Sequence, residues 1–150
     1  MTSGVDVVDS TGLVADHGAV QRLAEAVLMA EGVAGEVAVA FVDEASMIGL
    51  NARYRDAEGP TDVLAFDYGD EPGGGVSGEV VVCPQVVVRY AAEEGRDATL
   101  QLGWTLIHGV LHLAGYDHET DQGEMRAREQ ELLEALSRQV RALALSSSGG

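Results

Sequence analysis

Three of the four histidines in the chain, His108, His112 and His118, fall within eleven consecutive residues. His108 and His112 are four residues apart in an apolar stretch with helical spacing, so both imidazoles would lie on one helix face and reach one ion. Gly115 can adopt a positive φ angle and let the chain fold back, which would bring in His118 as a third nitrogen ligand. Three neutral imidazoles with an open fourth position are typical of catalytic zinc. The spacing therefore predicts a site for Zn²⁺, or for another divalent transition metal such as Ni²⁺.

The alternative for each histidine is structural, because a single histidine on an apolar helix is more often a hydrogen-bonded core residue. Three histidines at a known ligand spacing favour the metal. Tyr116 and Asp117 are predicted to orient these ligands through hydrogen bonds of their own. The fourth histidine, His17, follows Asp16 at the start of a predicted helix and is expected only to be exposed to solvent.

The same spacing, with Gly115 between the second and third histidines, matches the metzincin protease pattern H-E-x-x-H-x-x-G-x-x-H. The protease has its general base, a glutamate, directly after the first histidine. This chain has Gly109 there, and glycine cannot accept a proton. The sequence therefore argues against peptide hydrolysis by the metzincin mechanism.

The composition is that of an ordinary globular protein, with 46% hydrophobic and 23% charged residues among 150. No apolar run approaches the roughly 18 residues that span a bilayer, and the N-terminus lacks the pattern of a secretory signal. Cys83 is the only cysteine, so no intrachain disulfide can form. We expect a single cytoplasmic domain over residues 1–150, not associated with a membrane.

The net charge of −16 bears on the choice of substrate. Proteins that bind polyanions usually carry clustered lysine and arginine, because neutralising phosphates releases counterions. This chain has 25 acidic residues against nine basic ones, which excludes a generic nucleic-acid-binding protein. A nuclease is compatible with that charge if a metal and a few arginines form a local positive site.

The hydrophobic periodicity changes between strand and helix along the chain without strict alternation, which predicts an α+β fold. The pattern predicts strands over 5–9, 36–42, 61–68 and 79–82, and helices over 16–31, 43–53, 84–94, 99–114 and 121–145. Asp16 and Asp43 are expected N-caps, and Asp121 with Glu124 an N-terminal capping box for the last helix. We expect a flexible glycine-rich connection over 69–78, an ordered core over about 5–145 and a disordered tail over 146–150.

The segment from His108 to His118, HGVLHLAGYDH, resembles the pattern H-G-x-L-H-L-x-G-Y-D-H of the YbeY family at every fixed position. LNARYR at 50–55, PTDVLAF at 60–66 and GEVVV at 78–82 are similar to further blocks of that family, in the same order. The resemblance covers about 5–145. Ala65 stands where the family usually has serine, Glu79 where it has aspartate, and Trp104 where many members have another histidine. The last difference argues against an additional histidine at this site.

The resemblance implies a cytoplasmic, single-strand-specific metallo-endoribonuclease with a small mixed sheet packed against about four to five helices. It implies zinc on the three matched histidines and action on single-stranded rRNA of the small ribosomal subunit, in 16S rRNA 3′-end maturation and late ribosome quality control. It also implies that Arg55 is a functional arginine near the metal cleft, which suits a bidentate phosphate contact. The alternative for Arg55 is a surface ion pair with Asp56 or Glu58.

Other polar residues have simpler interpretations. The general base is not identified, although Asp117 and Glu119 are candidates. Cys83 is expected to be a buried inert thiol, and Thr61 and Asp62 to fix the turn before a strand. The last helix is expected to present a solvated face over an apolar stripe; that face comprises Arg126, Arg128, Glu129, Glu131 and Glu134, and the stripe Met125, Leu132, Leu133 and Leu136.

Three functions follow from this sequence, each from a different class. The first is a zinc endoribonuclease of ribosome maturation. The second is a metzincin-like hydrolase, a protease with its base elsewhere, against which Gly109 argues. The third is a metal-stabilised, ribosome-associated factor whose catalysis is weak or absent. The acidic composition is compatible with it, whereas the open fourth ligand position argues against a purely structural role.

Overall fold

The computed structural model describes residues 4–14, 16–70, 75–117 and 120–143. These residues form four strands: β1 (Gly4–Asp9), β2 (Gly35–Phe41), β3 (Val63–Asp70) and β4 (Val76–Val82). They also form six helices: α1 (His17–Ala30), α2 (Glu44–Arg55), α3 (Pro84–Glu94), α4 (Ala98–Leu113), α5 (Glu124–Ala135) and α6 (Ser137–Ala142). The predicted α+β class is confirmed.

The four strands form one mixed sheet in the order β1-β2-β4-β3. β1, β2 and β4 run parallel, and β3 is antiparallel to β4 at one edge. The parallel pair β1–β2 is connected through α1, the helical crossover that parallel strands require. The resemblance therefore implied the mixed sheet correctly, and β1 lies at the edge opposite β3.

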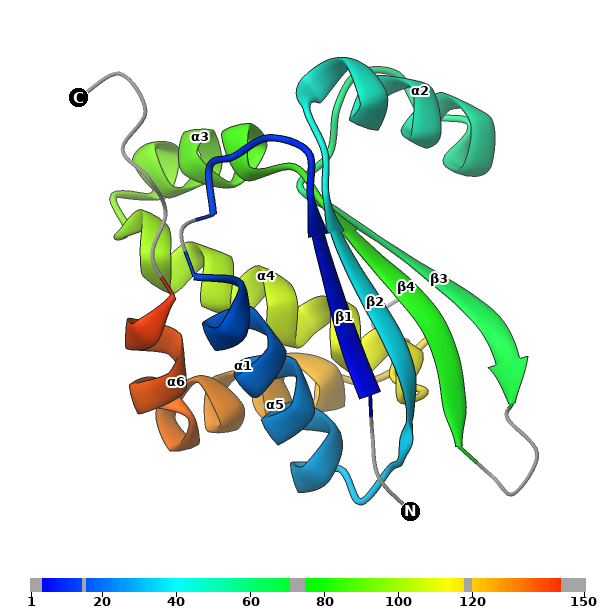
Figure 1. Ribbon diagram of the computed structural model, residues 1–150, viewed down its shortest axis with the longest axis vertical. Helices are drawn as coiled ribbons and strands as arrows, with labels where there is room; N and C mark the ends of the chain where they lie inside the picture. Colours follow the sequence, from blue (N-terminus) through cyan, green and yellow to red (C-terminus); the bar gives the residue numbers. More distant parts are fainter. Residues whose placement is uncertain (1–3, 15, 71–74, 118–119, 144–150) are drawn as a thin grey trace.

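Both faces of the sheet are covered around β4, which explains why its last three residues are all valine. Val80 and Val82 belong to the main core with α1 and α4, whereas Val81 faces a smaller core with Met47 of α2. Alternate residues of a strand point to opposite faces, so an unbroken apolar run marks a strand buried on both sides. In Figure 1, α1 and α4 lie together along the sheet and α2 lies apart from them at its upper end.

Aspartate caps fix the start of three helices. Asp16 accepts a hydrogen bond from Ala19 N at 2.9 Å, and Asp43 accepts one from Ser46 N at 2.8 Å. Asp97 caps α4 in the same way, through Leu100 N at 3.1 Å. Each carboxylate satisfies a backbone N–H that has no partner within its helix. The two predicted N-caps are therefore confirmed.

The C-terminal region differs from the prediction of one helix over 121–145. The helix breaks at Leu136, whose φ and ψ angles of −105° and 24° are not helical, so α5 and α6 are separate and the helices number six. Asp121 and Glu124 do bond to the backbone, at Met125 N (2.9 Å) and Gln122 N (2.6 Å), but the helix starts only at Glu124. The predicted tail at 146–150 lies outside the described residues.

The glycine-rich segment 69–78 was predicted to be a flexible connection, and this is wrong at both of its ends. Residues 69 and 70 continue β3, and β4 begins at Val76. Backbone pairing between the two strands extends that far, with a register irregularity between Asp67 and Gly69. Strand pairing thus overrides the local preference of glycine for turns.

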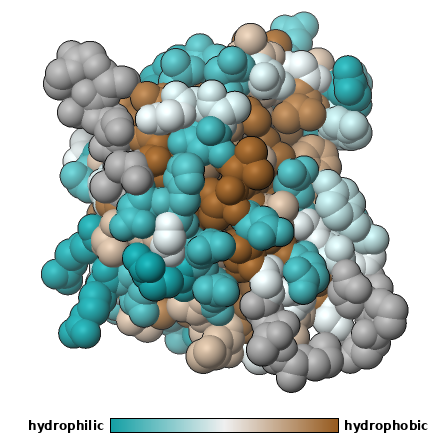
Figure 2. Space-filling model, viewed as in Figure 1, coloured by the Kyte–Doolittle hydropathy of each residue, from teal (hydrophilic) through white to brown (hydrophobic). Residues whose placement is uncertain are grey.

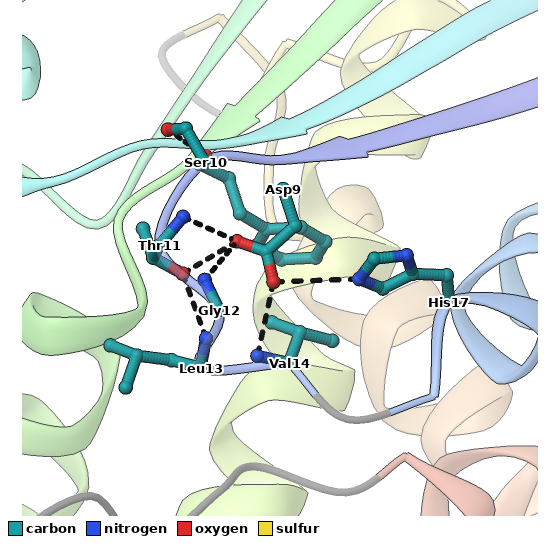
Figure 3. Close-up of polar contacts among 8 residues, drawn as sticks. Asp9, Ser10, Thr11, Gly12, Leu13, Val14 and His17 are labelled. Carbon is teal, nitrogen blue, oxygen red and sulfur yellow. Dashed lines mark hydrogen bonds and ion pairs between the residues drawn. The ribbon is translucent and has the colours of Figure 1, made fainter.

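The turn after β1 is organised by one carboxylate, that of Asp9 (Figure 3). Its oxygens accept hydrogen bonds from Thr11 N at 2.8 Å, from Gly12 N at 3.2 Å and from Val14 N at 3.2 Å. His17 is exposed as predicted, and its Nε2 in addition lies 3.4 Å from Asp9 Oδ2. Burial acts to raise the pKa of Asp9, but the hydrogen bonds from Thr11, Val14 and His17 prevail and lower it.

Apolar residues gather in the middle of the face on which β1 and α1 lie, surrounded by hydrophilic ones (Figure 2). Val8 of β1 is one of the large apolar side chains exposed in the described part of the chain.

Among the described residues, no helix is both long and apolar enough to cross a membrane.

Candidate active site

Gly109 lets α4 lie directly on the sheet. A Cβ atom at this position would come within 2.6 Å of Val80 Cγ1 and 3.4 Å of Val63 Cγ2. The glycine after the first histidine is therefore needed for packing, because any side chain there would be directed into β3 and β4. The side chain of a glutamate at this position would extend from the buried face of α4, which packs against the sheet.

His108 and His112 lie on the half-buried side of α4, one turn apart. Their ring centroids are 4.8 Å apart and the rings meet edge to face, at 82°. The structure thus brings two of the three predicted ligands together, as the i, i+4 spacing required.

Gly115 directs the chain away from α4. Its φ angle is 112°, a left-handed conformation that favours glycine, and α4 has already ended at Leu113. His118 and Glu119 lie outside the described residues. Within the described ranges, no three His, Cys, Asp or Glu side chains gather closely enough to hold a metal ion. A site on His108 and His112 would therefore need His118 to complete it.

Glu129 is the residue that the sequence interpretation placed wrongly. It was assigned to a solvated face of the last helix, yet it is only 3% exposed. Its Oε2 lies 2.5 Å from His108 Nδ1. An ionised carboxylate can only accept, so His108 donates through Nδ1–H. Arg128 is also not solvated, because its Nε donates to Glu31 Oε2 at 2.7 Å.

Glu129 could have been found from its spacing. It lies four residues after Met125 and three before Leu132, both of which are buried. A carboxylate within an apolar stripe needs a buried partner, because burying an unpaired charge is costly. The half-buried histidines of the neighbouring helix are the partners that the sequence offered.

The indole of Trp104 stacks on the imidazole of His108. Its ring centroid lies 5.4 Å from that of His108, with 29° between the planes. Trp104 precedes His108 by one helical turn, so both are on the same face of α4. The His108 ring thus contacts the indole of Trp104 through its face and the carboxylate of Glu129 through Nδ1.

Asp62 lies near His108 and precedes β3. Burial raises the pKa of its carboxyl group, while backbone hydrogen bonds and the proximity of His108 act in the opposite direction. Its backbone carbonyl accepts from Cys83 N at 2.9 Å, which fits the predicted role of fixing the turn. Its side chain in addition lines a cavity of about 260 Å³ beside the histidines.

Arg55 is exposed at the last residue of α2. Within the described part of the chain it forms no ion pair, so the predicted alternative with Asp56 or Glu58 is not seen. It lines a cavity of about 290 Å³ with Tyr54, Leu64, Ala65 and Phe66. No contact joins Arg55 to His108 or His112 among the described residues.

The edge strand β3 links Arg55 to the histidines indirectly. Val63 packs against α4 at Gly109, and Ala65 lines the cavity beside Arg55. Two residues along a strand share a face and are about 7 Å apart. Val63 and Ala65 therefore connect, along one strand, the site where α4 packs on the sheet and the cavity that Arg55 lines.

Other candidates have structural roles. Burial and a hydrogen bond to Glu31 raise the pKa of Tyr116, so this tyrosine is directed to α1 rather than to a histidine. Cys83 is fully buried, which confirms the prediction, and burial raises the pKa of its thiol.

An α+β fold that places two half-buried histidines next to a carboxylate, an indole and a polar cavity defines a small enzyme rather than a binding module. The family described as Endoribonuclease YbeY matches residues 12–137. The chain belongs to the YbeY family.

Three relatives named Endoribonuclease YbeY illustrate the similarity. The relative from Roseiflexus sp. is 36% identical, over 90% of this chain and 92% of its own. That from Pelotomaculum thermopropionicum is 40% identical over 80% and 86%, and that from Thermobifida fusca 39% over 86% and 91%. The solution structure of TM1509 from Thermotoga maritima is similar over 92% of both chains, with 28% identity and a TM-score of 0.65.

Proposed function

We propose that this chain is a zinc-dependent endoribonuclease that cleaves single-stranded RNA. The relatives it resembles are named endoribonucleases, and they cover most of its length. The proposal rests on the His108–His112 pair with Glu129 on His108 Nδ1, because two imidazoles one helical turn apart can bind one ion and the carboxylate can fix the orientation of one of them.

The residues fit zinc chemically. His108, His112 and His118 would hold the ion, as nitrogen donors that zinc accepts in catalytic sites. A carboxylate on the second nitrogen of a ligating histidine fixes its tautomer and orientation, and Glu129 is placed to do this for His108. When bound, zinc supplies Lewis acidity, which lowers the pKa of water to about 7 and polarises a phosphoryl oxygen.

Arg55 binds the phosphate in this proposal. It is exposed, carries no ion pair with a described residue and lies at the cavity beside β3. A guanidinium can hold two phosphate oxygens at once and stabilise charge that develops on them. With a net charge of −16, the rest of the surface repels RNA, so binding depends on this local positive site.

Peptide hydrolysis is disfavoured by the packing of Gly109. The position where a metzincin carries its base is occupied here by a glycine in contact with Val80. A base for RNA cleavage would therefore have to come from another residue.

The resemblance of the sequence supports a narrower role. We propose that the RNA is 16S rRNA, that cleavage contributes to the maturation of its 3′ end and to late ribosome quality control, and that the small ribosomal subunit is the partner. We also propose that the protein acts in the cytoplasm. These proposals rest on membership of the family.

The test compares His112→Ala with His17→Ala, which removes a histidine at the start of α1 instead. Zinc content and cleavage of a single-stranded RNA oligonucleotide are measured for both and for the unmodified protein, with casein as the peptide substrate. We expect His112→Ala to lose zinc and RNA cleavage together, His17→Ala to keep both, and casein to remain intact. RNA left intact by a folded, zinc-loaded protein would favour the non-catalytic factor, and chelator-sensitive casein digestion would favour the protease.

A further inference from the structure

A polar cavity of about 260 Å³ lies beside Trp104, the residue that stacks on His108. It lies where α4 packs against both α3 and α5 (Figure 1). Ligand pockets in proteins are commonly about 300–1,000 Å³, so this one suits a single ring-sized group. It is distinct from the Arg55 cavity, with which it shares no lining residue.

The indole of Trp104 connects this cavity to the histidines. It lines the cavity and also stacks on His108, with 5.4 Å between the ring centroids. A group bound beside Trp104 is therefore one side chain away from a predicted metal ligand. Aromatic side chains are the usual platforms for the bases of single-stranded nucleic acids, because every base has a π face.

Two arginines also line the cavity, Arg96 and Arg126, and neither forms an ion pair with any residue in the described ranges. Arg96 Nη1 donates to Gln101 Oε1 at 3.3 Å, so the guanidinium of Arg96 is oriented by a side chain that carries no charge. In a chain with 25 acidic and nine basic residues, this cavity brings two of the nine cations together. Both guanidinium groups can donate charge-assisted hydrogen bonds to a phosphate.

The cavity is not a general anion site, because Asp62 and Glu94 line it as well. Carboxylates repel phosphate but accept hydrogen bonds from the amino groups of bases. An indole, carboxylates and arginines in one small cavity fit a nucleotide, which presents a ring, amino groups and a phosphate together.

We propose that this cavity is a subsite for one nucleotide of the RNA substrate. The base stacks on Trp104 with its amino group toward Asp62, and the adjoining phosphate pairs with Arg126. The inference rests on the proposed endoribonuclease function and names the part of the substrate that this cavity recognises. Bases within a duplex are already stacked and paired, so only an unpaired nucleotide can enter. The subsite would thus select single strands next to the cleavage site.

The test uses Trp104 itself, which is the only tryptophan in the chain and gives a single indole N–H signal in NMR spectra. The zinc-loaded full chain is titrated with cytidine and adenosine 5′-monophosphates, which have a base and a phosphate but no phosphodiester bond that the enzyme could cleave. Ribose 5-phosphate is the control without a base. We expect the monophosphates to shift the indole signal in a saturable way and ribose 5-phosphate to leave it in place.

Variants separate this subsite from the packing of the histidine. Trp104→Leu should raise the KM for single-stranded RNA roughly fivefold or more, whereas Trp104→Phe, which keeps an aromatic face, should stay close to the unmodified protein. Arg126→Gln, which does not touch His108, should also raise KM without changing zinc content. Arg22→Gln on α1 removes the same charge at an exposed position and should have no effect.

The outcomes distinguish this inference from the proposed function. If the protein cleaves RNA but the indole signal ignores the monophosphates, or responds equally to ribose 5-phosphate, the nucleotide subsite is wrong while the nuclease stands. An Arg126→Gln variant with an unchanged KM would overturn the phosphate contact. If the monophosphates bind at Trp104 but no RNA is cleaved, the subsite stands and the nuclease proposal fails.

Discussion

Glu129 Oε2 lies 2.5 Å from Nδ1 of His108, and the two residues come from different helices and are 21 positions apart in sequence. The contact is buried on the glutamate side, where the side chain is 4% exposed. It fixes the orientation of the imidazole through Nδ1, and a metal ion ligated by this histidine would then be bound through Nε2. The carboxylate therefore acts on the proposed metal through the histidine, as a positioning residue.

Removing this carboxylate should weaken zinc binding. Partners of ligating histidines typically contribute about 10–100-fold in metal affinity, so we expect a loss in that range for Glu129→Ala and a smaller one for Glu129→Gln, which can still accept. Competition with a chromogenic chelator measures the affinity, and circular dichroism verifies the fold. Glu131→Gln is the matched control, since its side chain is on the same helix and 66% exposed. An unchanged affinity in folded Glu129→Ala would show that the contact does not orient a ligand.

Gly109→Ala should destabilise the protein although alanine is the better helix former. Its Cβ atom would lie 2.6 Å from Val80 Cγ1, and such overpacking costs about 1–3 kcal/mol. Gly49→Ala in α2 is the control, because nothing lies within 4 Å of its Cβ position. There the substitution should stabilise, by up to about 1 kcal/mol. Urea unfolding of both variants measures the difference, and equal effects would contradict the close approach of α4 to the sheet.

Asp9→Asn should lower the melting temperature in a way that depends on pH. The folded-state pKa of Asp9 is lowered, so its carboxylate contributes stability above the unfolded pKa of about 3.9 and loses it as the pH falls through the folded value. The variant should therefore unfold earlier than the unmodified protein at pH 7. The gap between them should close as the solution is acidified below about pH 4. A gap that is constant across this range would mean that charge is not the stabilising factor.

Arg55→Ala should reduce RNA cleavage while leaving zinc content and the fold intact, because the side chain is exposed and lies in its own cavity. Arg55→Lys should recover only part of the rate, since an ammonium cannot reproduce the bidentate contact. Steady-state kinetics with a single-stranded oligonucleotide, together with metal analysis, makes the comparison. A parallel loss of zinc in Arg55→Ala would assign the arginine a structural role.

The sequence predicted the elements whose signals are local. Asp16 and Asp43 cap helices because each carboxylate and the N–H from which it accepts are three residues apart. Gly115 turns the chain because glycine, which has no Cβ atom, adopts a positive φ angle without strain. The histidine pair on α4 follows from helical spacing in the same way.

What the sequence interpretation missed depends on contacts between distant segments. Glu129 was taken as solvated because its partner, His108, lies on another helix. Gly109 was noted only as a missing base, since its contact with Val80 exists only once α4 lies on the sheet. The helix breaks at Leu136 without a proline or glycine that would have indicated the break in the sequence. The short helix α6 that follows packs against α1 and α4.

The central claim is that one metal ion is held by His108, His112 and His118. Anomalous scattering at the zinc edge, recorded from crystals of the zinc-loaded protein, tests it most directly. The account predicts one peak within about 2.0–2.2 Å of a nitrogen of each of the three histidines, with Nε2 as the ligand atom of His108. A peak away from these residues, or one bound by His108 Nδ1 with Glu129 displaced, would contradict it.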